Sequence, residues 1–472
     1  MISRTWPPRP TPPAGGVVAA VLDGAYRAVG QDVAGALDVD VDAISGVPVI
    51  QGSLPSWDLV VVAGHAAASR WRELRGSNPG DVVVEATTGG GEAPPRSRDG
   101  LATAALPDSA DVVVVGAGIC GLMVAYALAQ AGSTVAVVDG SYRIAEQTTS
   151  WNNGMVHPGH DPQPDTVKAR LTVQGNAQWA AVAAAVGLPF QRRASLVVGF
   201  GTDDQPRLDA FLARARANAV PGAKLISGDE ARSIEPRLSS AVSGALYFPT
   251  TSSIDAAAAS EALAVAVRRL GSTVTLAAPV GSITTGDGGV TGVVVGDRHI
   301  AARVVVNAAG VFADLLARTA GSRRYSIHPR RGSLVLFDPG ESDRYHTSVG
   351  PIPGEFSKGG GMTARPDGLT TGGPTAVEQQ GRVAEPPSQD EVDHILGLGQ
   401  RIYPAFPTAS IVNIGSAVRA ATYCEDFVVG PAPGIRGLID VAGTQSPAIA
   451  SAPAIARSVV GALRAHGYLP AP

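Results

Sequence analysis

The sequence predicts an α/β protein in which a buried, mostly parallel sheet is interrupted by a second sheet. Residues 111–139 follow a strand–turn–helix–strand pattern, which is typical of a parallel βαβ unit. Apolar runs typical of buried strands continue as far as residues 438–442, so we expect the chain to return to its first sheet near its end. The 472 residues exceed what one hydrophobic core supports, and we expect two or three domains.

Ahead of the βαβ unit, residues 1–86 are expected to form a small N-terminal α/β appendage. Residues 1–14 are rich in proline, and we expect them to be disordered. Later apolar runs alternate with helix-compatible sequence such as residues 65–74. The segment carries no phosphate loop, metal-ligand spacing or catalytic cluster, which favours a packing or partner-binding role. Residues 87–109 are rich in Gly, Pro and Ala and are expected to be a linker.

The βαβ unit at residues 111–139 has the features of a Rossmann-type dinucleotide site. A run of four valines at 112–115 precedes a glycine-rich turn, and a helix is expected at 119–131. The second strand, 134–138, ends at Asp139, and a carboxylate about 20 residues after the glycines is where a ribose hydroxyl is bound. This pattern alone is equally compatible with NAD and with FAD. The tight turn, the approach to a pyrophosphate and the helix–strand packing are assigned to Gly116, Gly118 and Gly121, respectively.

Composition argues against several functional classes. The net charge is only −4 and no basic patch stands out, so nucleic acid is not expected as a partner. Two cysteines, Cys120 and Cys424, are too few for an iron–sulfur cluster or a disulfide framework, and Cys120 in the glycine turn is expected to be a small filler. The start lacks the apolar core of a signal peptide, and the βαβ unit explains the uncharged stretch 112–138 better than a transmembrane helix does. We therefore expect a cytoplasmic protein.

Beyond the βαβ unit, the chain is expected to alternate between two sheets. Residues 148–154 are a cluster of small polar residues that can donate hydroxyl and N–H groups to a phosphate or a flavin edge. Helices are expected at 166–186, 255–270 and 448–465, and the last begins after a turn at 443–447 where its N-terminus can face an anion. Strands are expected at 189–200, 245–248, 274–276, 280–283, 290–295, 303–306, 333–337, 369–373, 411–419 and 438–442.

Seven segments between residues 111 and 465 resemble those of the flavin-dependent D-amino-acid oxidase (DAO) superfamily, in the same order and spacing. The similarity is greatest to the branch of L-2-hydroxyglutarate oxidase and anaerobic glycerol-3-phosphate dehydrogenase. It does not extend to residues 1–108, and the sequence lacks the cysteine-rich C-terminal domain of the glycerol-phosphate branch. The segments are GAGICG, NNGMVHPGHDPQPDTVKARLTVQGN, YFPTTSSIDAAAASEAL, VVVNAAGVFADLLA, HPRRGSLVLFD, VRAATYCEDFVVGPAP and AGTQSPAIASAPAIA.

The resemblance implies a glutathione-reductase-like FAD-binding domain of Rossmann type, with an inserted mixed β-sheet substrate domain and non-covalent FAD. Its FAD-binding segments would be residues 110–190, 251–330 and 411–472, and its substrate segments 191–250 and 331–410. The implied FAD contacts are Gly116, Gly118 and Gly121 at the pyrophosphate, Asp139 at the adenosine ribose, Thr149, Asn152 and Gly154 in the loop that borders the flavin, Val280 on the adenine side, Ala309 and Gly310 near the phosphates, and Ser446 and Pro447 at the pyrimidine end.

The resemblance also implies oxidation of a carbon that bears an amine or a hydroxyl. His157 lies in the segment matched to the flavin border and titrates near neutrality, so it is the candidate base, with a structural histidine as the alternative. Arg419 and Arg331 are candidate readers of a substrate carboxylate because a guanidinium offers forked donors, with structural ion pairs as the alternative. Weaker candidates are His160, Arg330 and a flavin-facing Lys358, whereas Lys168 and Arg170 are expected to be ion-paired or solvated.

We therefore expect an FAD-dependent amine oxidase or dehydrogenase. It would transfer a hydride to the flavin from the α-carbon of a small amino acid or N-substituted amine, with O2 or another electron acceptor reoxidising the flavin. The appendage suggests a role in a specialised biosynthetic pathway. Two alternatives stay open: an L-2-hydroxy-acid dehydrogenase that passes electrons to a quinone, and a flavoprotein scaffold whose residues 1–108 bind a protein partner.

Overall fold

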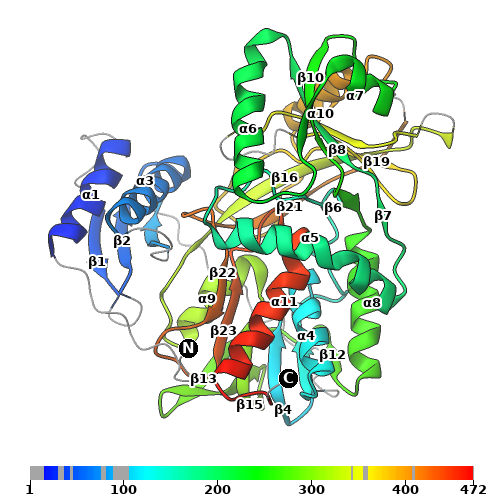
Figure 1. Cartoon of the computed structure of the whole chain (residues 1–472). Coiled ribbons are helices and arrows are strands. Elements are labelled where there is room, and N and C mark those ends of the chain that lie inside the picture. The colour runs from blue at the N-terminus through cyan, green and yellow to red at the C-terminus, as the bar shows by residue number, and fades with distance from the viewer. Residues whose placement is uncertain are drawn as a thin grey trace.

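The chain forms two stacked bodies, each built on a large sheet, with the N-terminal appendage beside them (Figure 1). The α/β architecture expected from the sequence is confirmed. The proline-rich start and most of the linker lie outside the residues that the structure describes. The computed structural model describes residues 15–29, 37–42, 46–75, 81–88, 106–341, 344–354, 360–406 and 410–470.

The lower body in Figure 1 is built on the sheet that contains the βαβ unit. β4 (Ser109–Val115) pairs in parallel with β5 (Val135–Val138) and with β15 (Arg298–Asn307). β15 also pairs in parallel with β23 (Leu438–Ala442), so the chain returns to its first sheet near its end, as predicted. The remaining strands are β12 (Thr273–Thr275), β13 (Val280–Gly286), β14 (Gly289–Val295) and β22 (Val428–Pro431).

Helices cover the lower sheet, and their apolar side chains form one core with its strands. Leu122, Leu171, Leu263 and Leu463 come from four different helices and are all buried in this core. A short helix, α9 (Ala313–Thr319), contacts β13 and β23. The three predicted helices beyond the βαβ unit occur within one residue of their expected bounds. The four helices of the core are α4 (Ile119–Gln130), α5 (Val167–Val186), α8 (Ala256–Arg269) and α11 (Ala448–Ala465).

The upper body is a mixed sheet whose longest strands, β16 (Ile327–Phe337) and β21 (Ile411–Thr422), are antiparallel along their whole length. Residues 411–472 are predicted to belong to the FAD-binding body, but β21 lies in the upper sheet because it pairs with β16. The other strands are β8 (Ser195–Phe200), β9 (Lys224–Ser227), β10 (Val242–Phe248), β17 (Ser348–Pro351), β18 (Met362–Ala364), β19 (Thr370–Gly372) and β20 (Val377–Glu378), and the helices are α6 (Gln205–Ala217), α7 (Gly228–Ile234) and α10 (Gln389–Ile402).

Three two-residue strands link the bodies. β11 (Ser252–Ser253) pairs with β6 (Met155–Val156) on one side and with β7 (Gln191–Arg192) on the other. The single strand predicted at 189–200 is therefore two strands, β7 and β8, separated by Arg193 and the left-handed residue Ala194. Two 3-10 turns, η1 (Thr202–Asp204) and η2 (Gly310–Phe312), complete the elements described for the two bodies.

The appendage is a three-stranded sheet packed against two helices, with a core of its own that includes Trp71. The apolar run at residues 17–22 lies in a helix, with Val21 buried and Ala19 exposed. Among the residues that the structure describes, no helix combines the length and the apolar character needed to cross a bilayer. The elements of the appendage are α1 (Gly15–Val29), β1 (Leu37–Val41), β2 (Pro48–Ser53), α3 (Trp57–Arg75) and β3 (Val83–Thr87).

Candidate active site

The turn between β4 and α4 has no room for a side chain at two of its glycines. Gly116 has a φ of +113°, and a β-carbon there would lie 2.3 Å from the carbonyl oxygen of Ala308. A β-carbon on Gly121 would lie 2.0 Å from the carbonyl oxygen of Gly116. At Gly118 the nearest atom to such a carbon is the hydroxyl oxygen of Thr149, at 3.1 Å. A bare backbone at a helix N-terminus suits a pyrophosphate, and we propose that these glycines hold it.

Asp139 ends β5 beside this turn. Its Oδ2 accepts a hydrogen bond from the N–H of Ala117 at 2.6 Å, and its Oδ1 accepts one from the N–H of Ser141 at 2.7 Å. The hydroxyl of Thr149 accepts a hydrogen bond from the N–H of Ile119 at 3.3 Å. The carboxylate therefore lies at the start of the turn and the hydroxyl at the first residue of α4. These positions suit the proposed contacts with a ribose and a phosphate.

The polar loop at residues 148–154 is held in shape by its own side chains. The Asn152 amide donates to the carbonyl of Thr148 at 3.3 Å, and its Oδ1 accepts from the N–H of Gly154 at 2.7 Å. Gly154 has a φ of +67°, and a β-carbon there would lie 2.2 Å from the carbonyl oxygen of Ile254. The Thr148 hydroxyl donates to the carbonyl of Val418 at 2.6 Å, which ties the loop to β21. The Asn152 side chain thus shapes the loop that is expected to border the flavin.

The predicted contacts on the adenine and phosphate sides lie on or directly after two strands of the lower sheet, β13 and β15, which β14 separates. Val280 is half-buried at the start of β13, and Ala278, two residues earlier, donates its N–H to the carbonyl of Asp139 at 2.8 Å. Ala309 and Gly310 follow β15, and Gly310 takes a φ of +57° at the start of η2. The backbone N of Ala309 would lie 3.5 Å from a β-carbon on Gly116, so Ala309 is close to the glycine turn.

A buried guanidinium, that of Arg330, joins β16 to the turn before α11. Arg330 is 1% exposed. Its Nη2 donates to Glu425 at 2.7 Å, its Nε donates to Glu378, and its Nη1 donates to Gln445 at 3.4 Å. Burial alone would raise the pKa of Glu425, but the positive charges around it, led by Arg330, hold that pKa well below its ordinary value. Gln445 immediately precedes Ser446-Pro447, the predicted contacts at the pyrimidine end of the flavin.

Arg331 faces the opposite side of β16, and its surroundings favour the structural ion pair over its predicted role as a substrate reader. Its Nη1 binds Glu385 and its Nη2 binds Glu391, both at 2.8 Å. Neighbouring side chains on a strand point to opposite faces, which separates Arg331 from Arg330. Burial alone would raise the pKa of Glu391, but hydrogen bonds from the Ser388 N–H and the Ser333 hydroxyl, together with Arg331, lower it to about 2. Arg331 therefore serves a structural ion-pair cluster.

Arg419 lies directly opposite Arg330 on the neighbouring strand and has a different environment. Its Nη2 donates to the carbonyl of Thr375 at 2.6 Å. Within the described part of the chain, no carboxylate lies within 4.0 Å of its guanidinium. Burial, and then the positive charge of Arg330, lowers the pKa of Arg419 to about 10. Arg419 is therefore a half-buried cation with no carboxylate partner among the described residues, which makes it a candidate for binding an anion.

A cavity of about 60 Å³ between the polar loop and the upper sheet is lined by His157. Pro374 lines the same cavity and packs over Gly332. A β-carbon on Gly332 would lie 3.2 Å from the Cβ of Pro374 and 2.6 Å from the Nη2 of Arg419. Pro374 therefore connects the cavity lined by His157 with the surroundings of the Arg419 guanidinium, which is not itself part of the lining.

The weaker candidates have structural surroundings. His160 is 6% exposed and stacks on Phe248, with ring centroids 4.2 Å apart. Lys168 is buried, and its ammonium lies 4.0 Å from Glu425. Arg170 is exposed on α5, in agreement with the expected solvated role. Lys358 lies outside the described residues.

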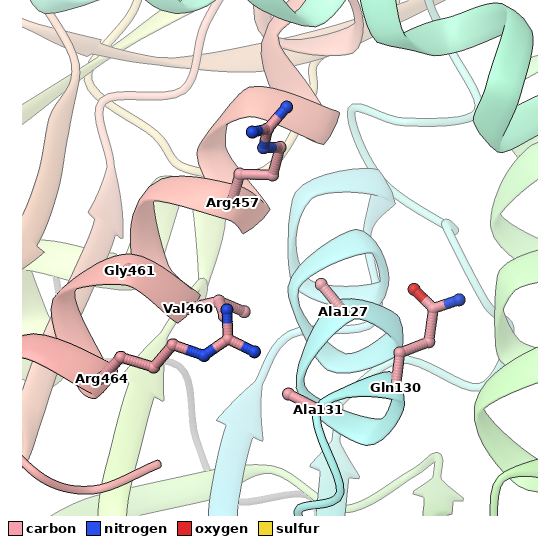
Figure 2. A pocket seen from close by; sticks show the side chains of 7 residues that line it. All are labelled: Ala127, Gln130, Ala131, Arg457, Val460, Gly461 and Arg464. Atoms are coloured by element: carbon pink, nitrogen blue, oxygen red, sulfur yellow. The ribbon is translucent and has the colours of Figure 1, made fainter. Parts of the chain in front are cut away.

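A larger groove of about 430 Å³ runs between α4 and α11 and is a different feature (Figure 2). Arg457 and Arg464 project from α11 on one side, and Ala127 and Gln130 of α4 line the other. The groove lies at the C-terminal end of α4, whereas the glycine turn lies at its N-terminal end. The 12 residues of α4 separate the two by about 18 Å, so this groove is not part of the candidate site.

Sequence reasoning missed Glu378, Glu425 and Gln445. Each contacts Arg330 from a distant part of the chain, and although Glu425 and Gln445 lie in two of the matched segments, nothing in those segments indicates a pairing with Arg330. Glu425 has one structural signal, a φ of +57°, which is uncommon outside glycine and is enriched at functional sites. The pKa of Cys120, whose thiol is hydrogen-bonded by Thr444, is raised by burial to about 12, which supports its prediction as an inert filler.

Comparison with known proteins gives the family. A glycerol 3-phosphate dehydrogenase from Caloramator mitchellensis is 28% identical over 354 residues, which are 75% of this chain and 74% of that protein. An L-2-hydroxyglutarate dehydrogenase from Pongo abelii is 27% identical over 386 residues, which are 76% and 89% of the two chains.

A solved structure of FAD-bound, dithionite-reduced L-α-glycerophosphate oxidase from Mycoplasma pneumoniae superposes with a TM-score of 0.71 at 25% identity. It covers 76% of this chain and 95% of that one. Residues 111–461 match the family DAO, described as FAD dependent oxidoreductase. The resemblance seen in the sequence is thereby confirmed, as are FAD as the cofactor and the fold that it implied. The chain belongs to the DAO family and is an FAD-dependent oxidoreductase.

Proposed function

We propose that this enzyme oxidises a small organic anion at a carbon that bears a hydroxyl or an amine, and that Arg419 binds the anionic group. FAD, when bound, accepts the hydride. The observation that carries the proposal is the half-buried Arg419 guanidinium, which has one carbonyl partner and no carboxylate partner within the described residues. A substrate anion would compensate this charge and fix the position of the reacting carbon.

The charges around Arg419 support this assignment. Arg330, its cross-strand neighbour, is held between the carboxylates of Glu378 and Glu425 and is therefore already compensated. Arg331 is compensated by two other carboxylates on the opposite face of β16. Among the three arginines singled out from the sequence, Arg419 is thus the one with a charge left for a ligand.

A hydroxyl compound is the first substrate class that we propose. The relatives at the sequence level are named for glycerol 3-phosphate and L-2-hydroxyglutarate, each of which is an alcohol with an anionic group. Hydride loss from an alcohol also needs a base for the hydroxyl proton, and His157 lines a cavity whose wall includes Pro374, the residue before the Thr375 carbonyl that Arg419 binds. A small amino acid or N-substituted amine, which the sequence analysis favours, is the second class, since a neutral amine needs no such base.

Anaerobic mixing of the purified holoenzyme with a panel of compounds tests the proposal. The panel contains glycerol 3-phosphate, 2-hydroxyglutarate, small amino acids and N-methyl amino acids, and bleaching of the flavin absorbance reports hydride transfer. We expect bleaching by a hydroxy anion, and bleaching by an amine alone would assign the second class. Readmission of oxygen distinguishes an oxidase from a dehydrogenase. Failure of every anion to bleach the flavin would overturn the proposal and favour the scaffold alternative.

A further inference from the structure

The appendage encloses one aromatic side chain of the catalytic body. Tyr423, in the turn between β21 and β22, is 3% exposed and belongs to the hydrophobic core of the appendage. Gly64 on α3 makes room for it, because a β-carbon there would lie 2.2 Å from the tyrosine ring. The turn is one of several contacts between the appendage and the body, since Glu85 also pairs with Arg318 and Arg323.

The appendage also binds the backbone of that turn. The carboxylate of Asp81, which is 1% exposed, accepts from the N–H of Tyr423 at 3.2 Å and from the N–H of Cys424 at 2.9 Å. The Nδ1 of His65 lies 2.9 Å from the carbonyl oxygen of Tyr423, and Arg72 donates to the carbonyl of Cys424. All four backbone polar groups of two consecutive residues are thus paired by three side chains of the appendage, which we call the clasp (His65, Arg72 and Asp81). Buried backbone groups need such partners.

The next residue in the chain is Glu425, one of the two carboxylates that compensate Arg330. Its backbone is held at a φ of +57°, a conformation that a non-glycine residue keeps only when its surroundings impose it. Its side chain binds both Arg330 and Gln445. His65 of the clasp approaches the same carboxylate, with its Nε2 3.8 Å from Oε1. The clasp therefore holds the residue next to Glu425, whose carboxylate compensates the charge of Arg330 beside the proposed substrate site.

A metal ion is a poorer explanation of these side chains. His65, His328 and Glu378 have ligand atoms within 4.8 Å of one another. However, the Nδ1 of His328 is already 2.8 Å from a Glu378 oxygen, and Arg330 donates to the other oxygen of that carboxylate. A divalent cation would have to displace these bonds beside a buried guanidinium that repels it. The three side chains fit a hydrogen-bonded charge network instead.

We propose that the appendage is a positioning element of the active site: the clasp fixes the turn so that Glu425 compensates Arg330 and leaves Arg419 alone to bind the substrate anion. This inference rests on the function proposed above. If the turn shifts, Arg330 keeps Glu378 but loses Glu425, so the positive charge beside Arg419 is less fully compensated. The appendage then acts on catalysis through Glu425, without touching the substrate.

The test uses the full-length holoenzyme, with Asp81→Asn and His65→Gln as clasp variants. The matched control is Arg70→Gln, which removes an exposed ion pair with Glu73 on the same helix as His65. Amide hydrogen exchange reports the turn directly. We expect slow exchange at the N–H of Tyr423 and Cys424 in the wild type and the control, and exchange at least about tenfold faster in Asp81→Asn.

A double-mutant cycle then separates positioning from a general loss of stability. The affinity for inorganic phosphate, followed by the change in flavin absorbance, and the separate values of KM and kcat are measured for Asp81→Asn, Glu425→Gln and the double variant. We expect each single variant to shift phosphate affinity or KM by about tenfold, and the double variant to shift it no further, because both changes act on the same carboxylate. His65→Gln provides the same comparison if Asp81→Asn does not fold.

Three outcomes are informative. Additive effects in the cycle, or clasp variants with wild-type affinity and KM, would overturn the inference and leave the appendage as a packing or partner-binding domain. Faster exchange in the turn with unchanged affinity would likewise overturn it. If Arg419→Met does not change phosphate affinity, the proposed function has failed, which is distinguishable because that variant leaves the clasp intact.

Discussion

Replacing Arg419 with methionine separates binding of the substrate from stability of the fold. Arg419 is half-buried, makes one hydrogen bond to the Thr375 carbonyl and lacks a carboxylate partner among the described residues. Hydrogen bonds to charged groups are worth about 1.5–3 kcal/mol each, so loss of a forked contact should cost about 3 kcal/mol, or about 100-fold in kcat/KM. The fold should lose little, because the guanidinium has no ion pair to lose and methionine retains much of the apolar part of the side chain.

Arg331→Met is the matched control, because it removes the same side chain one residue from Arg330 on the neighbouring strand. That change leaves two carboxylates, Glu385 and Glu391, without their cation, and we expect a loss of about 3 kcal/mol in unfolding free energy with kcat/KM close to wild type. Urea unfolding and anaerobic stopped-flow reduction of the flavin measure both quantities. The reasoning is refuted if Arg419→Met unfolds like the control and retains its kcat/KM.

Three further predictions address other parts of the site. Gly121→Ala should purify without yellow colour and with little bound FAD, because the new carbon would lie 2.0 Å from a carbonyl oxygen; a stoichiometric flavin content would contradict this. His157→Gln should lower kcat for a hydroxyl substrate by about 100-fold or more, whereas His160→Gln, which loses a ring stack, should affect stability more than kcat. Burial raises the pKa of Asp81 from 3.8 to about 7. The contribution of Asp81 to stability is therefore complete below pH 3.8 and is lost as the pH rises through about 7. The difference in unfolding free energy between the wild type and Asp81→Asn should fall over that range, and a difference that does not change with pH would refute the assignment.

The FAD anchor could be predicted from the sequence because its determinants are local. Gly116, Gly118, Gly121 and Asp139 lie within one βαβ unit, and the spacing of the glycines follows from the backbone geometry that the turn requires. The helices α5, α8 and α11 were equally predictable, since each has a continuous apolar pattern between recognisable ends.

The charges of the substrate site depend on distant pairings that no local pattern encodes. Arg330 and Arg331 are adjacent, yet only the register of β16 decides which faces Arg419 and which faces α10. The partners of Arg330 lie 48 and 95 residues away in sequence, and the clasp residue Asp81 binds a backbone group 343 residues away. The boundary at residue 411 was misplaced for the same reason, since the pairing of β21 with β16 is a tertiary property.

The sequence predicts a protein partner for residues 1–108, and the structure shows that this segment also contacts the catalytic body. Nothing in the motifs of the appendage suggested a catalytic role. The structure shows that the core of the appendage includes Tyr423 of the catalytic body. It also shows that the carboxylate of Asp81 accepts hydrogen bonds from the turn before Glu425. A partner-binding role for the outer surface of the appendage stays a prediction.

The most direct test of the account compares the reduction of the wild-type flavin by an anionic substrate and by its neutral analogue, such as glycerol 3-phosphate and glycerol, under anaerobic conditions. If Arg419 binds the anion, the charged compound should reduce the flavin with a kcat/KM about 100-fold higher than the neutral one, and Arg419→Met should abolish most of that preference. Equal rates for the charged and neutral compounds, or a preference that survives in Arg419→Met, would contradict the central claim.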